Sequence, residues 1–510
     1  MVDHVIGTRL RTAGGKHLPA GVKRRIDQLG ARGKQQSAIE ECGQTPELKG
    51  SFDQAEFPRK ERPTMTSLNP PSQSPRSDFN RRKFLSISAA GGLMAGAGIA
   101  AGAPSAWAKP KSVLPPSATF RAGLSVSPFT SSMLQKGLTY TDGSLTAASL
   151  EEVQRLFMAH GGNEVYARIA TRRTANDVDA QHGLEPGLEK ARLARKLGLP
   201  FNPELGLFAV YGDISHQPGP DFSDYPQIAV PGPWTSQPIT VMVAAMKDYG
   251  ARVARQILAT GAEVNVWDLG NEVEFGSAGV AIRSFTESTA YWSYSPPDAV
   301  DPEIGRMTAM QLFGMPDRTA WLKQHLWPHI GAIFAAVASG IRSVDPHARF
   351  STHTSTTAFY FPDLLTEFWQ SMSDAGIDFD EIGVSYYPTA TGGSLTSFQA
   401  TATLLKERYG KKVFISETGY PSGTMGQPFA WNSPLIEYPQ DQDGEYRFYR
   451  DLTAWGATSG VLSGIRPWAP DYALGGWQPM SFFTPEGNIA KAEPALRGIQ
   501  DGLPAGLPLL

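Results

Sequence analysis

The chain of 510 residues contains a single cysteine, Cys42, and its formal charge is only −3, because 46 basic side chains almost balance 49 acidic ones. One cysteine cannot form an intramolecular disulfide, so the folded state has to be stabilised by burial of a hydrophobic core. The small net charge provides no general attraction to nucleic acid or to an acidic membrane surface. We therefore expect neither as a partner.

Two common catalytic motifs are also missing from the sequence. There is no HExxH motif, and Pro328 interrupts the pair formed by His325 and His329, so a zinc site is not expected. No GxSxG nucleophile elbow occurs either. We expect no metal and no cofactor, although a calcium ion stays open, because calcium ligands have no fixed spacing outside an EF-hand.

The amino-terminal part differs in composition from the rest of the chain. Residues 1–64 are rich in Pro, Ser, Gln and charged side chains and have no sustained apolar period, so we expect them to be disordered. Met65 offers an alternative start, because it would leave a basic lead of ordinary length before Arg81. The extension 1–64 is then a mis-assigned part of the reading frame.

Residues 65–108 have the features of an export signal. Arg81 and Arg82 precede a Gly/Ala-rich apolar run at 84–101, and Ala106-Trp107-Ala108 is a small-x-small cleavage pattern. The whole resembles a twin-arginine signal peptide, which makes the twin-arginine export machinery a partner of the precursor. A mature chain of residues 109–510 would then be periplasmic or secreted, without a stable membrane anchor. An uncleaved anchor is the alternative, because the run is close to the ~20 residues that a spanning helix needs.

From about residue 120, short apolar runs alternate with longer segments of helical period, which predicts parallel strands joined by crossover helices. The candidate strands are 121–126, 164–170, 206–211, 263–269, 349–354, 381–386, 412–416 and 460–465. Helices are expected to start at Ser149 and Pro186 and to cover 238–260, 320–344, 362–375, 395–409, 445–458 and 489–499. Eight such units predict a (β/α)₈ TIM barrel as the single catalytic domain, with a doubly wound sheet as the alternative.

Two of the predicted strands are followed by long insertions. The first, 216–234, is rich in Pro, Gly and aromatic residues, and the second, 276–317, contains Tyr291, Trp292 and Tyr294. Loops of this length after barrel strands usually shape a binding site on the upper face. We expect a binding cleft there.

Two predicted strands are closely followed by a glutamate. WDLGNE (267–272) ends in Glu272, and VFISETGYP (413–421) contains Glu417 where its apolar run ends. As strands four and seven of an eight-stranded barrel, they would bring the two carboxyl groups to opposite sides of the C-terminal rim. Such a pair is the minimum equipment for hydrolysing a glycosidic bond, and the gap between the carboxyls, which distinguishes retention from inversion, stays open.

Other polar and aromatic residues fall at the same predicted rim, and each also fits a structural role. Asn271 can donate to a sugar hydroxyl, and the hydroxyl of Tyr386 can hold Glu417 ionised. Arg168 can supply positive charge, His353 can bind a sugar hydroxyl, and Trp468 can stack on a sugar ring.

Four segments carry a resemblance to a known family: 269–276 (LGNEVEFG), 382–395, 407–421 (ERYGKKVFISETGYP) and 466–472 (RPWAPDY). They resemble glycoside hydrolase family 53, the arabinogalactan endo-β-1,4-galactanases, within clan A. The resemblance implies a retaining hydrolase of β-galactan or a related β-linked polysaccharide. By it, Glu272 is the proton donor and Glu417 is the nucleophile, while Tyr211 and Asp213 match the family pattern in strand three.

The chain also departs from the family pattern. Glu274 and Phe275 stand where the family tends to have asparagines, residues 389–391 (Thr-Ala-Thr) replace bulkier residues, and Ala469 replaces a glutamate. Two alternatives therefore stay open. One is another clan A endo-β-glycosidase, and the other is a catalytically silent barrel that binds polysaccharide, which an ion pair burying either glutamate would favour.

The export signal can be tested through its two arginines. Exchanging Arg81 and Arg82 for lysine should hold the precursor in the cytoplasm, because the twin-arginine route reads the pair itself. Fractionation with immunoblotting measures the distribution. Unchanged export of the double variant would mean that another route carries the protein.

Overall fold

The computed structural model describes residues 120–283, 299–426 and 429–504. The predicted extension 1–64, the predicted signal 65–108, and the loop aromatics Tyr291, Trp292 and Tyr294 lie outside these ranges. Within the described residues, no helix combines the length and the apolar character that crossing a membrane requires.

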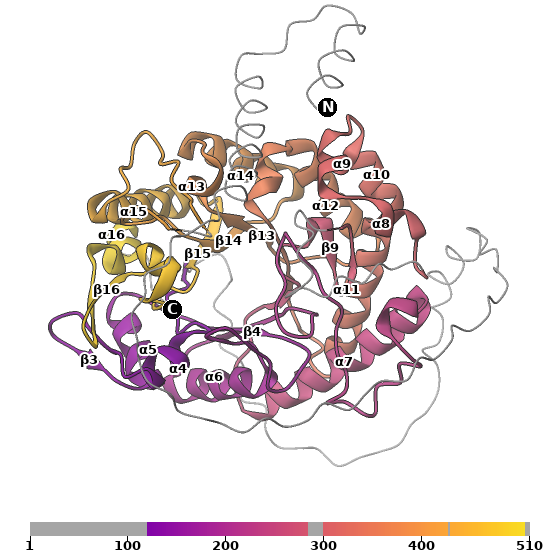
Figure 1. Cartoon of the computed structure of the whole chain (residues 1–510), viewed down its shortest axis with the longest axis horizontal. Helices are drawn as coiled ribbons and strands as arrows, with labels where there is room; N and C mark the ends of the chain where they lie inside the picture. The colour runs from indigo at the N-terminus through magenta and orange to yellow at the C-terminus, as the bar shows by residue number, and fades with distance from the viewer. Residues whose placement is uncertain (1–119, 284–298, 427–428, 505–510) are drawn as a thin grey trace, which may run out of the picture. The chain divides into compact units, whose positions relative to one another are not determined.

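Parallel strands form a closed ring in the described part of the chain, with helices around it (Figure 1). One sheet has the order β1-β15-β14-β13-β12, and the other has the order β11-β8-β7-β4. Only Thr352 separates β11 from β12, so the two sheets share one barrel strand. The ring strands are β1 (Arg121–Ala122), β4 (Val165–Ile169), β7 (Phe201–Leu205), β8 (Trp267–Leu269), β11 (Phe350–Ser351) with β12 (His353–Thr354), β13 (Ile382–Tyr386), β14 (Val413–Thr418) and β15 (Leu462–Pro467).

The ring closes between β1 and β4 at Asn163, whose backbone N–H donates to the carbonyl of Ala122 at 3.1 Å and whose side chain makes two further hydrogen bonds. Its Oδ1 accepts from the backbone N–H of Ala122 at 2.9 Å, and its Nδ2 donates to the carbonyl of Phe120 at 3.0 Å. The (β/α)₈ barrel is therefore confirmed, and a doubly wound open sheet is ruled out.

The helices between the strands follow the sequence signals. The Ser149 hydroxyl accepts from the N–H of Glu152 at the start of α5, and Gly198 ends α6 in the left-handed conformation. The helices are α4 (Thr130–Gln135), α5 (Leu150–Ala159), α6 (Leu184–Leu197), α7 (Ile239–Ala259), α8 (Pro302–Arg306), α9 (Ala309–Gly314), α10 (Arg318–His325), α11 (Trp327–Arg342), α12 (Pro362–Asp374), α13 (Pro388–Thr391), α14 (Leu395–Tyr409), α15 (Gln442–Ser459) and α16 (Gly498–Gly502).

Short elements complete the described chain outside the ring. The strands are β2 (Thr139–Thr141), β3 (Thr146–Ala147), β5 (Asn176–Asp177), β6 (Ala180–Gln181), β9 (Gly276–Ser277), β10 (Val280–Ala281), β16 (Phe483–Glu486) and β17 (Ile489–Ala492). The 3₁₀ turns are η1 (Trp234–Ser236), η2 (Val273–Phe275), η3 (Thr356–Tyr360), η4 (Gly475–Met480) and η5 (Pro494–Arg497).

Three element predictions were wrong. The third barrel strand is β7 (Phe201–Leu205) and not 206–211, because Asn202 and Glu204 find charged partners inside the barrel. The segment 489–499 begins as strand β17, which pairs with β16 and β2, so strand pairing overrides its helical pattern. The predicted helix 320–344 is divided at Leu326, because Pro328 has no N–H to donate and starts a new helix.

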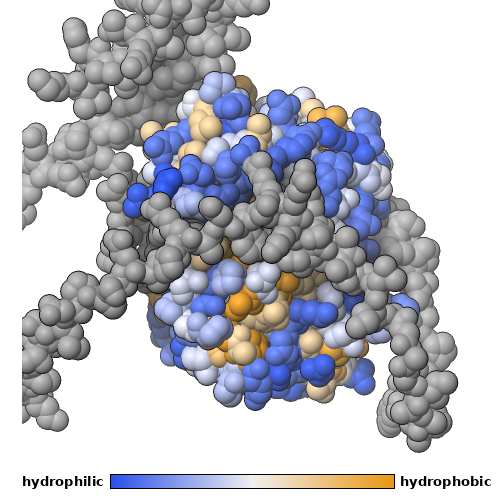
Figure 2. All heavy atoms as spheres, turned by 90° about the vertical axis from the view of Figure 1, so that its right-hand side faces the viewer, coloured by the Kyte–Doolittle hydropathy of each residue, from blue (hydrophilic) through white to orange (hydrophobic). Residues whose placement is uncertain are grey.

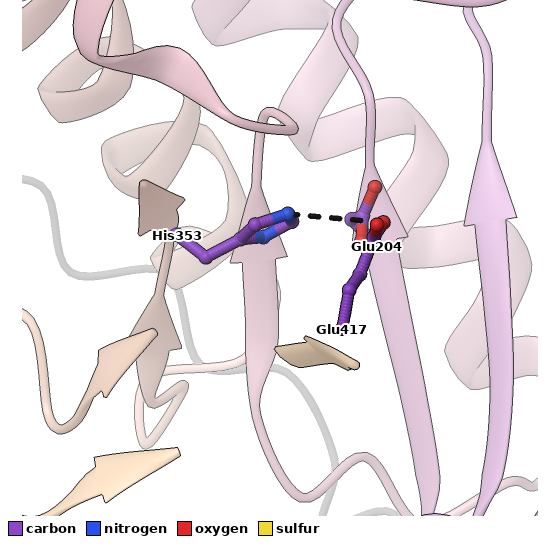
Figure 3. A group of neighbouring side chains, drawn as sticks. All are labelled: Glu204, His353 and Glu417. Atoms are coloured by element: carbon purple, nitrogen blue, oxygen red, sulfur yellow. Dashed lines mark ion pairs between the residues drawn. The ribbon is translucent and has the colours of Figure 1, made fainter. Parts of the chain in front are cut away.

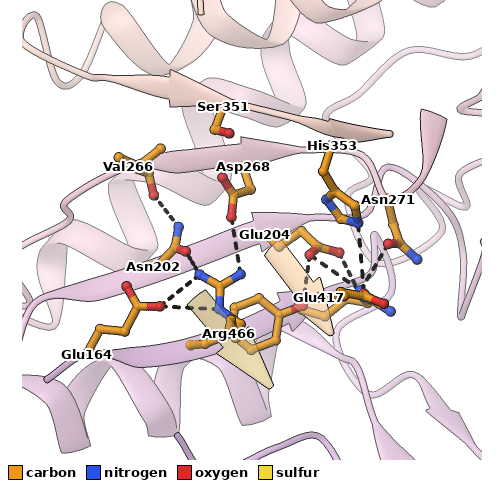
Figure 4. A network of polar contacts seen from close by, with 12 residues as sticks. Glu164, Asn202, Glu204, Val266, Asp268, Asn271, Ser351, His353, Glu417 and Arg466 are labelled. Carbon is orange, nitrogen blue, oxygen red and sulfur yellow. Dashed lines mark hydrogen bonds and ion pairs between the residues drawn. The ribbon is translucent and has the colours of Figure 1, made fainter. Parts of the chain in front are cut away.

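The barrel interior is polar rather than filled with apolar layers. Arg121 Nε and Arg466 Nη2 contact the two carboxylate oxygens of Glu164 at 3.0 and 2.9 Å, and Arg466 Nη1 lies 3.6 Å from Asp268 Oδ2. All four side chains are buried. Figure 4 shows Glu164, Asp268 and Arg466 of this group beside a second polar group that contains Glu417. Losing one partner would leave an uncompensated buried charge, so the interior tolerates little change.

The outer surface is mainly hydrophilic on the face drawn in Figure 2, where hydrophobic residues gather in a smaller patch. Beneath the surface, α7 and α11 pack closely at glycines. A Cβ added at Gly340 would lie 2.0 Å from the carbonyl oxygen of Lys247, and one at Gly250 would lie 2.6 Å from that of Val337. Two helices of the outer layer therefore approach each other closely enough to exclude a methyl group.

The close approach predicts a stability effect. Gly340→Ala should lower the free energy of unfolding by about 1–3 kcal/mol, the usual cost of overpacking. Gly314→Ala, at a helical glycine with nothing within 4 Å of its added Cβ, is the matched control and should be neutral or stabilise by up to about 1 kcal/mol. Urea unfolding of both variants checks this, and equal effects would contradict it.

Candidate active site

Glu272 follows β8 at a sharp turn of the backbone. Gly270 has φ 76° and Glu272 has φ 50°, so a non-glycine residue occupies the left-handed region. Such backbone strain persists only where the surrounding structure enforces it, and it is common at functional sites. The turn places the carboxylate so that the backbone N–H of Ile214 donates to its Oε2 at 3.1 Å. Glu272 is only 7% exposed.

Glu417 reaches the barrel interior because β14 carries one extra residue. Ile415 pairs with Val384, but the next partner of the neighbouring strand, Ser385, pairs with Glu417. Ser416 is therefore the extra residue, and the pairing of β14 with β15 shifts in the same segment. Strict alternation would place Ser416 and Glu417 on opposite faces. A bulge re-aims a side chain in this way, and bulges are frequent next to active sites.

The guanidinium of Arg168 joins three acceptors at the centre of the site. Its Nε lies 2.5 Å from Glu204 Oε1, and its Nη2 donates to Asn271 Oδ1 at 3.0 Å. The same Nη2 forms an ion pair with Glu417 Oε1. Tyr166 adds a hydrogen bond to the other oxygen of Glu204, at 2.8 Å. All five side chains are buried, so these interactions act with little screening by water.

The second carboxylate oxygen of Glu417 accepts from Tyr387. The Tyr387 hydroxyl lies 2.9 Å from Glu417 Oε2. The sequence assigns this hydrogen bond to Tyr386, and the structure corrects it by one residue. The ring of Tyr386 stacks on Phe398 of α14 at a centroid distance of 4.1 Å, so it faces the helical layer. Adjacent strand residues point to opposite faces, and only one of the two tyrosines can face the barrel interior.

The remaining predicted residues lie around the same centre. His353 Nε2 is 3.9 Å from Glu417 Oε1, and Figure 3 shows its ring directed toward the carboxylates of Glu204 and Glu417. Burial lowers the pKa of His353 to about 4, so the ring is neutral at pH 7. The Arg168 guanidinium lies 4.2 Å from the ring centroid of Trp468 and 5.7 Å from that of Tyr211. One face of Trp468 is therefore already used by the arginine.

The two glutamates sit in unequal electrostatic surroundings. Burial, the charge of Glu417 and the charge of Asp213 raise the pKa of Glu272 well above its usual range, and the N–H of Ile214 opposes them. Burial and the charge of Glu204 also raise the pKa of Glu417 above its usual range, but the Arg168 charge and the hydrogen bonds from Arg168 and Tyr387 offset part of this rise. Glu272 is therefore the one that better retains a proton near neutral pH.

Glu274 is a second carboxyl close in sequence to Glu272, but its carboxylate is bound elsewhere. Its two oxygens accept from the backbone N–H of Ser355 at 3.1 and 3.0 Å, and the Ser355 hydroxyl also donates. The side chain is fully buried, next to the residue that follows β12.

Glu204, His353 and Glu417 are close enough together to be considered as metal ligands, because one potential ligand atom from each lies within 4.8 Å of the others. The residues present do not fit a cation there. The guanidinium of Arg168 already supplies positive charge to both carboxylates, through Nε to Glu204 and Nη2 to Glu417. A metal ion would have to displace a buried arginine.

Sequence reasoning missed Glu204, Tyr166 and Tyr387. Glu204 lies in the segment FNPEL, whose Asn, Pro and Glu argue against a strand. The alternation in β13 was an available signal for Tyr387. Gly383 lies on the inner face, because a Cβ added there would lie 2.7 Å from the Cβ of His353. Side chains alternate between the two faces of a strand, so Tyr387, four residues later, lies on the same face.

A parallel (β/α)₈ barrel with one buried carboxyl beyond strand four and another on strand seven defines the class of barrel glycoside hydrolases. The sequence profile described as "Glycosyl hydrolase family 53" matches residues 132–481, and the chain belongs to this family. It is a retaining glycosidase.

Curated relatives are similar over most of the barrel. The chain is 22% identical over 335 residues to "Probable arabinogalactan endo-beta-1,4-galactanase A" of Neosartorya fischeri, covering 66% of this chain and 79% of the relative. It is 24% identical over 319 residues to "Arabinogalactan endo-beta-1,4-galactanase A" of Emericella nidulans, covering 62% and 76%.

Solved structures agree in fold. The "Ignisphaera aggregans GH53 catalytic domain" superposes with a TM-score of 0.55 at 17% identity, covering 78% of this chain and 99% of that chain. A structure from a study of two fungal β-1,4-galactanases gives a TM-score of 0.52 at 18% identity, covering 75% and 99%.

The hydrogen bond to Glu417 predicts which tyrosine affects activity. Tyr387→Phe should lower kcat by about 10- to 100-fold, because a hydrogen bond to a charged group contributes about 1.5–3 kcal/mol. Tyr386→Phe is the matched control and should change kcat far less, since its ring packs on the helical layer. Steady-state kinetics on an aryl glycoside measures both, and a larger loss for Tyr386→Phe would contradict this placement.

Proposed function

We propose that the protein is an exported endo-acting hydrolase of β-galactan or of a related β-linked polysaccharide, with Glu272 as proton donor and Glu417 as nucleophile. The observation that carries this proposal is the pairing of two buried glutamates in unequal surroundings on a family 53 barrel. Glu417 accepts from Arg168 and Tyr387, whereas Glu272 accepts one backbone N–H in the described part of the chain.

In the first step, a Glu417 oxygen bonds to the anomeric carbon, and the glycosidic carbon–oxygen bond breaks. The proton of Glu272 passes to the departing oxygen. In the second step, ionised Glu272 takes a proton from water, whose oxygen bonds to the anomeric carbon as the ester bond to Glu417 breaks. Arg168 and Tyr387 favour the ionised form of Glu417 before attack and on its release.

The neighbouring residues complete the proposed site. Asn271 uses one N–H on the carbonyl of Gly212 at 2.6 Å, which leaves its second N–H for a sugar hydroxyl. Trp468, 8% exposed, can stack a sugar on the face away from Arg168. Tyr211 and Asp213 act beside the proton donor Glu272, and the charge of Asp213 helps Glu272 to keep its proton. His353 stays neutral beside Glu417.

Metal and cofactor are not part of the proposed chemistry, because Arg168 supplies the positive charge beside the nucleophile. The polysaccharide is the substrate partner. For the amino terminus, we propose export through the twin-arginine route to the periplasm or the exterior. The support is the sequence pattern at 81–108.

The substrate range is proposed to be wider than linear β-1,4-galactan. The small residues 389–391 lie in α13, shortly after β13, and the backbone N–H of Ser433 donates to the carbonyl of Thr389 at 3.2 Å. This contact brings the segment after β14 to the same place, where the Trp431 ring lies 5.2 Å from that of Tyr387. An aromatic ring beside the nucleophile is suited to stacking on additional or branched sugar units.

A polysaccharide-binding barrel without activity is the second candidate function, because Glu417 is 5% exposed and ion-paired with Arg168. The contact with Glu204 argues against it. Arg168 is bound to two carboxylates at once, so its single charge does not neutralise Glu417 completely.

The substrate proposal is tested on a panel of polysaccharides with the purified mature chain. We expect cleavage of β-1,4-galactan together with branched or other β-linked polymers, measured as reducing ends. Cleavage of linear β-1,4-galactan alone would show that the small residues at 389–391 do not widen the range. Tight binding of a polymer without any cleavage would favour the silent barrel.

The two glutamates are assigned by variants and azide. Glu272→Ala should lower the rate of polysaccharide hydrolysis by about 10²–10⁴-fold, the usual contribution of general acid–base catalysis. It should retain the first step on an aryl glycoside with a good leaving group, and azide should accelerate its second step. Glu417→Ala should lose both activities, because no covalent intermediate can form.

Glu274→Ala is the matched control for the pair. Because Ser355 binds the Glu274 carboxylate, this variant should keep substantial activity on both substrates. If azide instead restores activity to Glu274→Ala, then Glu274 is the proton donor and the assignment of Glu272 is wrong.

A further inference from the structure

Glu204 is a buried carboxyl next to the proposed nucleophile that the reaction steps above do not use. It belongs to β7, is 0% exposed and has both oxygens occupied. Oε1 lies 2.5 Å from Arg168 Nε, and Oε2 accepts from Tyr166 at 2.8 Å. Glu417 binds the same guanidinium at Nη2. One arginine therefore contacts two carboxylates from different strands.

The geometry leaves Glu204 one means of acting on the reaction. Its two oxygens are taken by Arg168 and Tyr166, so it acts through the arginine rather than on the sugar. Tyr166 is held in turn, because the Arg466 guanidinium lies 4.1 Å from its ring centroid. The position of Glu204 is thus fixed from the polar interior of the barrel (Figure 4).

The charge balance shows why the arrangement matters. If Arg168 contacted Glu417 alone, a full positive charge would stabilise that carboxylate, and a strongly stabilised carboxylate is a weak nucleophile. With Glu204 on Nε, the charge of Arg168 is divided between two acids. Glu417 also has other titratable neighbours, which come from several strands: Tyr166 of β4, Tyr211 after β7, Glu272 after β8, His353 of β12 and Tyr387 after β13. Arg466 of β15 in turn acts on His353.

We propose that Glu204 is a positioning residue that orients Arg168 and divides its charge, so that Glu417 is ionised at working pH and still reactive. The proposal rests on the proposed role of Glu417 as nucleophile. It assigns a function to β7, a barrel strand that contributes no residue to either reaction step.

Glu204→Gln tests the charge without removing the side chain. The amide oxygen can still accept from Arg168 Nε, so the guanidinium keeps a partner, but the negative charge is lost. The full charge of Arg168 then acts on Glu417 and lowers its pKa. Activity falls on the acid side when Glu417 is protonated, so the acid limb of kcat/KM should move to lower pH by about one unit. The alkaline limb, set by Glu272, should stay in place.

The same variant should separate kcat from KM. We expect kcat at the optimum to fall about 10-fold or more, because a more stabilised carboxylate attacks more slowly, while KM changes little. Glu204→Asp keeps the charge on a shorter side chain and is the conservative control. Its acid limb should stay at the wild-type pH even though a poorer fit to Arg168 lowers kcat.

Each outcome bears on one hypothesis. Wild-type protein that hydrolyses no glycoside would contradict the proposed function, not only this inference. Active wild-type protein with an unmoved acid limb in Glu204→Gln would overturn the role of Glu204 alone, and so would a shift of equal size in Glu204→Asp. Thermal unfolding is measured alongside. If Glu204→Gln does not accumulate as folded protein, Glu204→Asp decides alone, and a moved acid limb there overturns the proposal.

Discussion

The site depends on one buried arginine held between carboxylates. Arg168 is contributed by β4, Glu204 by β7 and Glu417 by β14, and the ion pairs among them join strands far apart in the sequence. Water screens these buried charges only a little, so each contact is stronger than on the surface, and each unpaired charge would cost more free energy. The barrel interior around Arg121 and Arg466 is also built from buried ion pairs, so it contains polar contacts where an apolar core would otherwise lie.

The electrostatic difference between the two glutamates follows from where each backbone segment ends. Glu272 lies beyond β8 in a left-handed turn, where one backbone N–H from Ile214 is its hydrogen-bond donor in the described part of the chain. Glu417 lies on β14 and is turned inward by a bulge toward Arg168 and Tyr387. The two side chains are thereby divided: burial raises the pKa of both, but Arg168 and Tyr387 oppose this rise at Glu417, so Glu272 retains a proton more readily. This division is what a double displacement needs.

Much of the fold could be predicted from the sequence, because apolar runs and helix caps are local signals. The strand that precedes Glu272 and the strand that contains Glu417 were found because their apolar residues are continuous. The strand with Glu204 was missed because its Asn, Pro and Glu look like a loop until the arginines of other strands are present. The hydrogen bond to Glu417 was assigned to Tyr386 instead of Tyr387 for a different reason. Two tyrosines stand next to each other at the end of β13, and one has to know which of them faces the barrel interior. Gly383 lies on the inner face, but this becomes clear only from its contact with His353. The bulge at Ser416 arises from how β14 pairs with its neighbouring strands, so the residues of β14 alone do not reveal it.

The most direct test of the account is the anomeric configuration of the first product. Proton NMR during the early phase of hydrolysis distinguishes the anomer released by the enzyme from the one formed later by mutarotation. The account predicts that the β anomer appears first, because attack by Glu417 and then by water inverts the anomeric carbon twice. First appearance of the α anomer would contradict it, since a single displacement would leave Glu417 no covalent role.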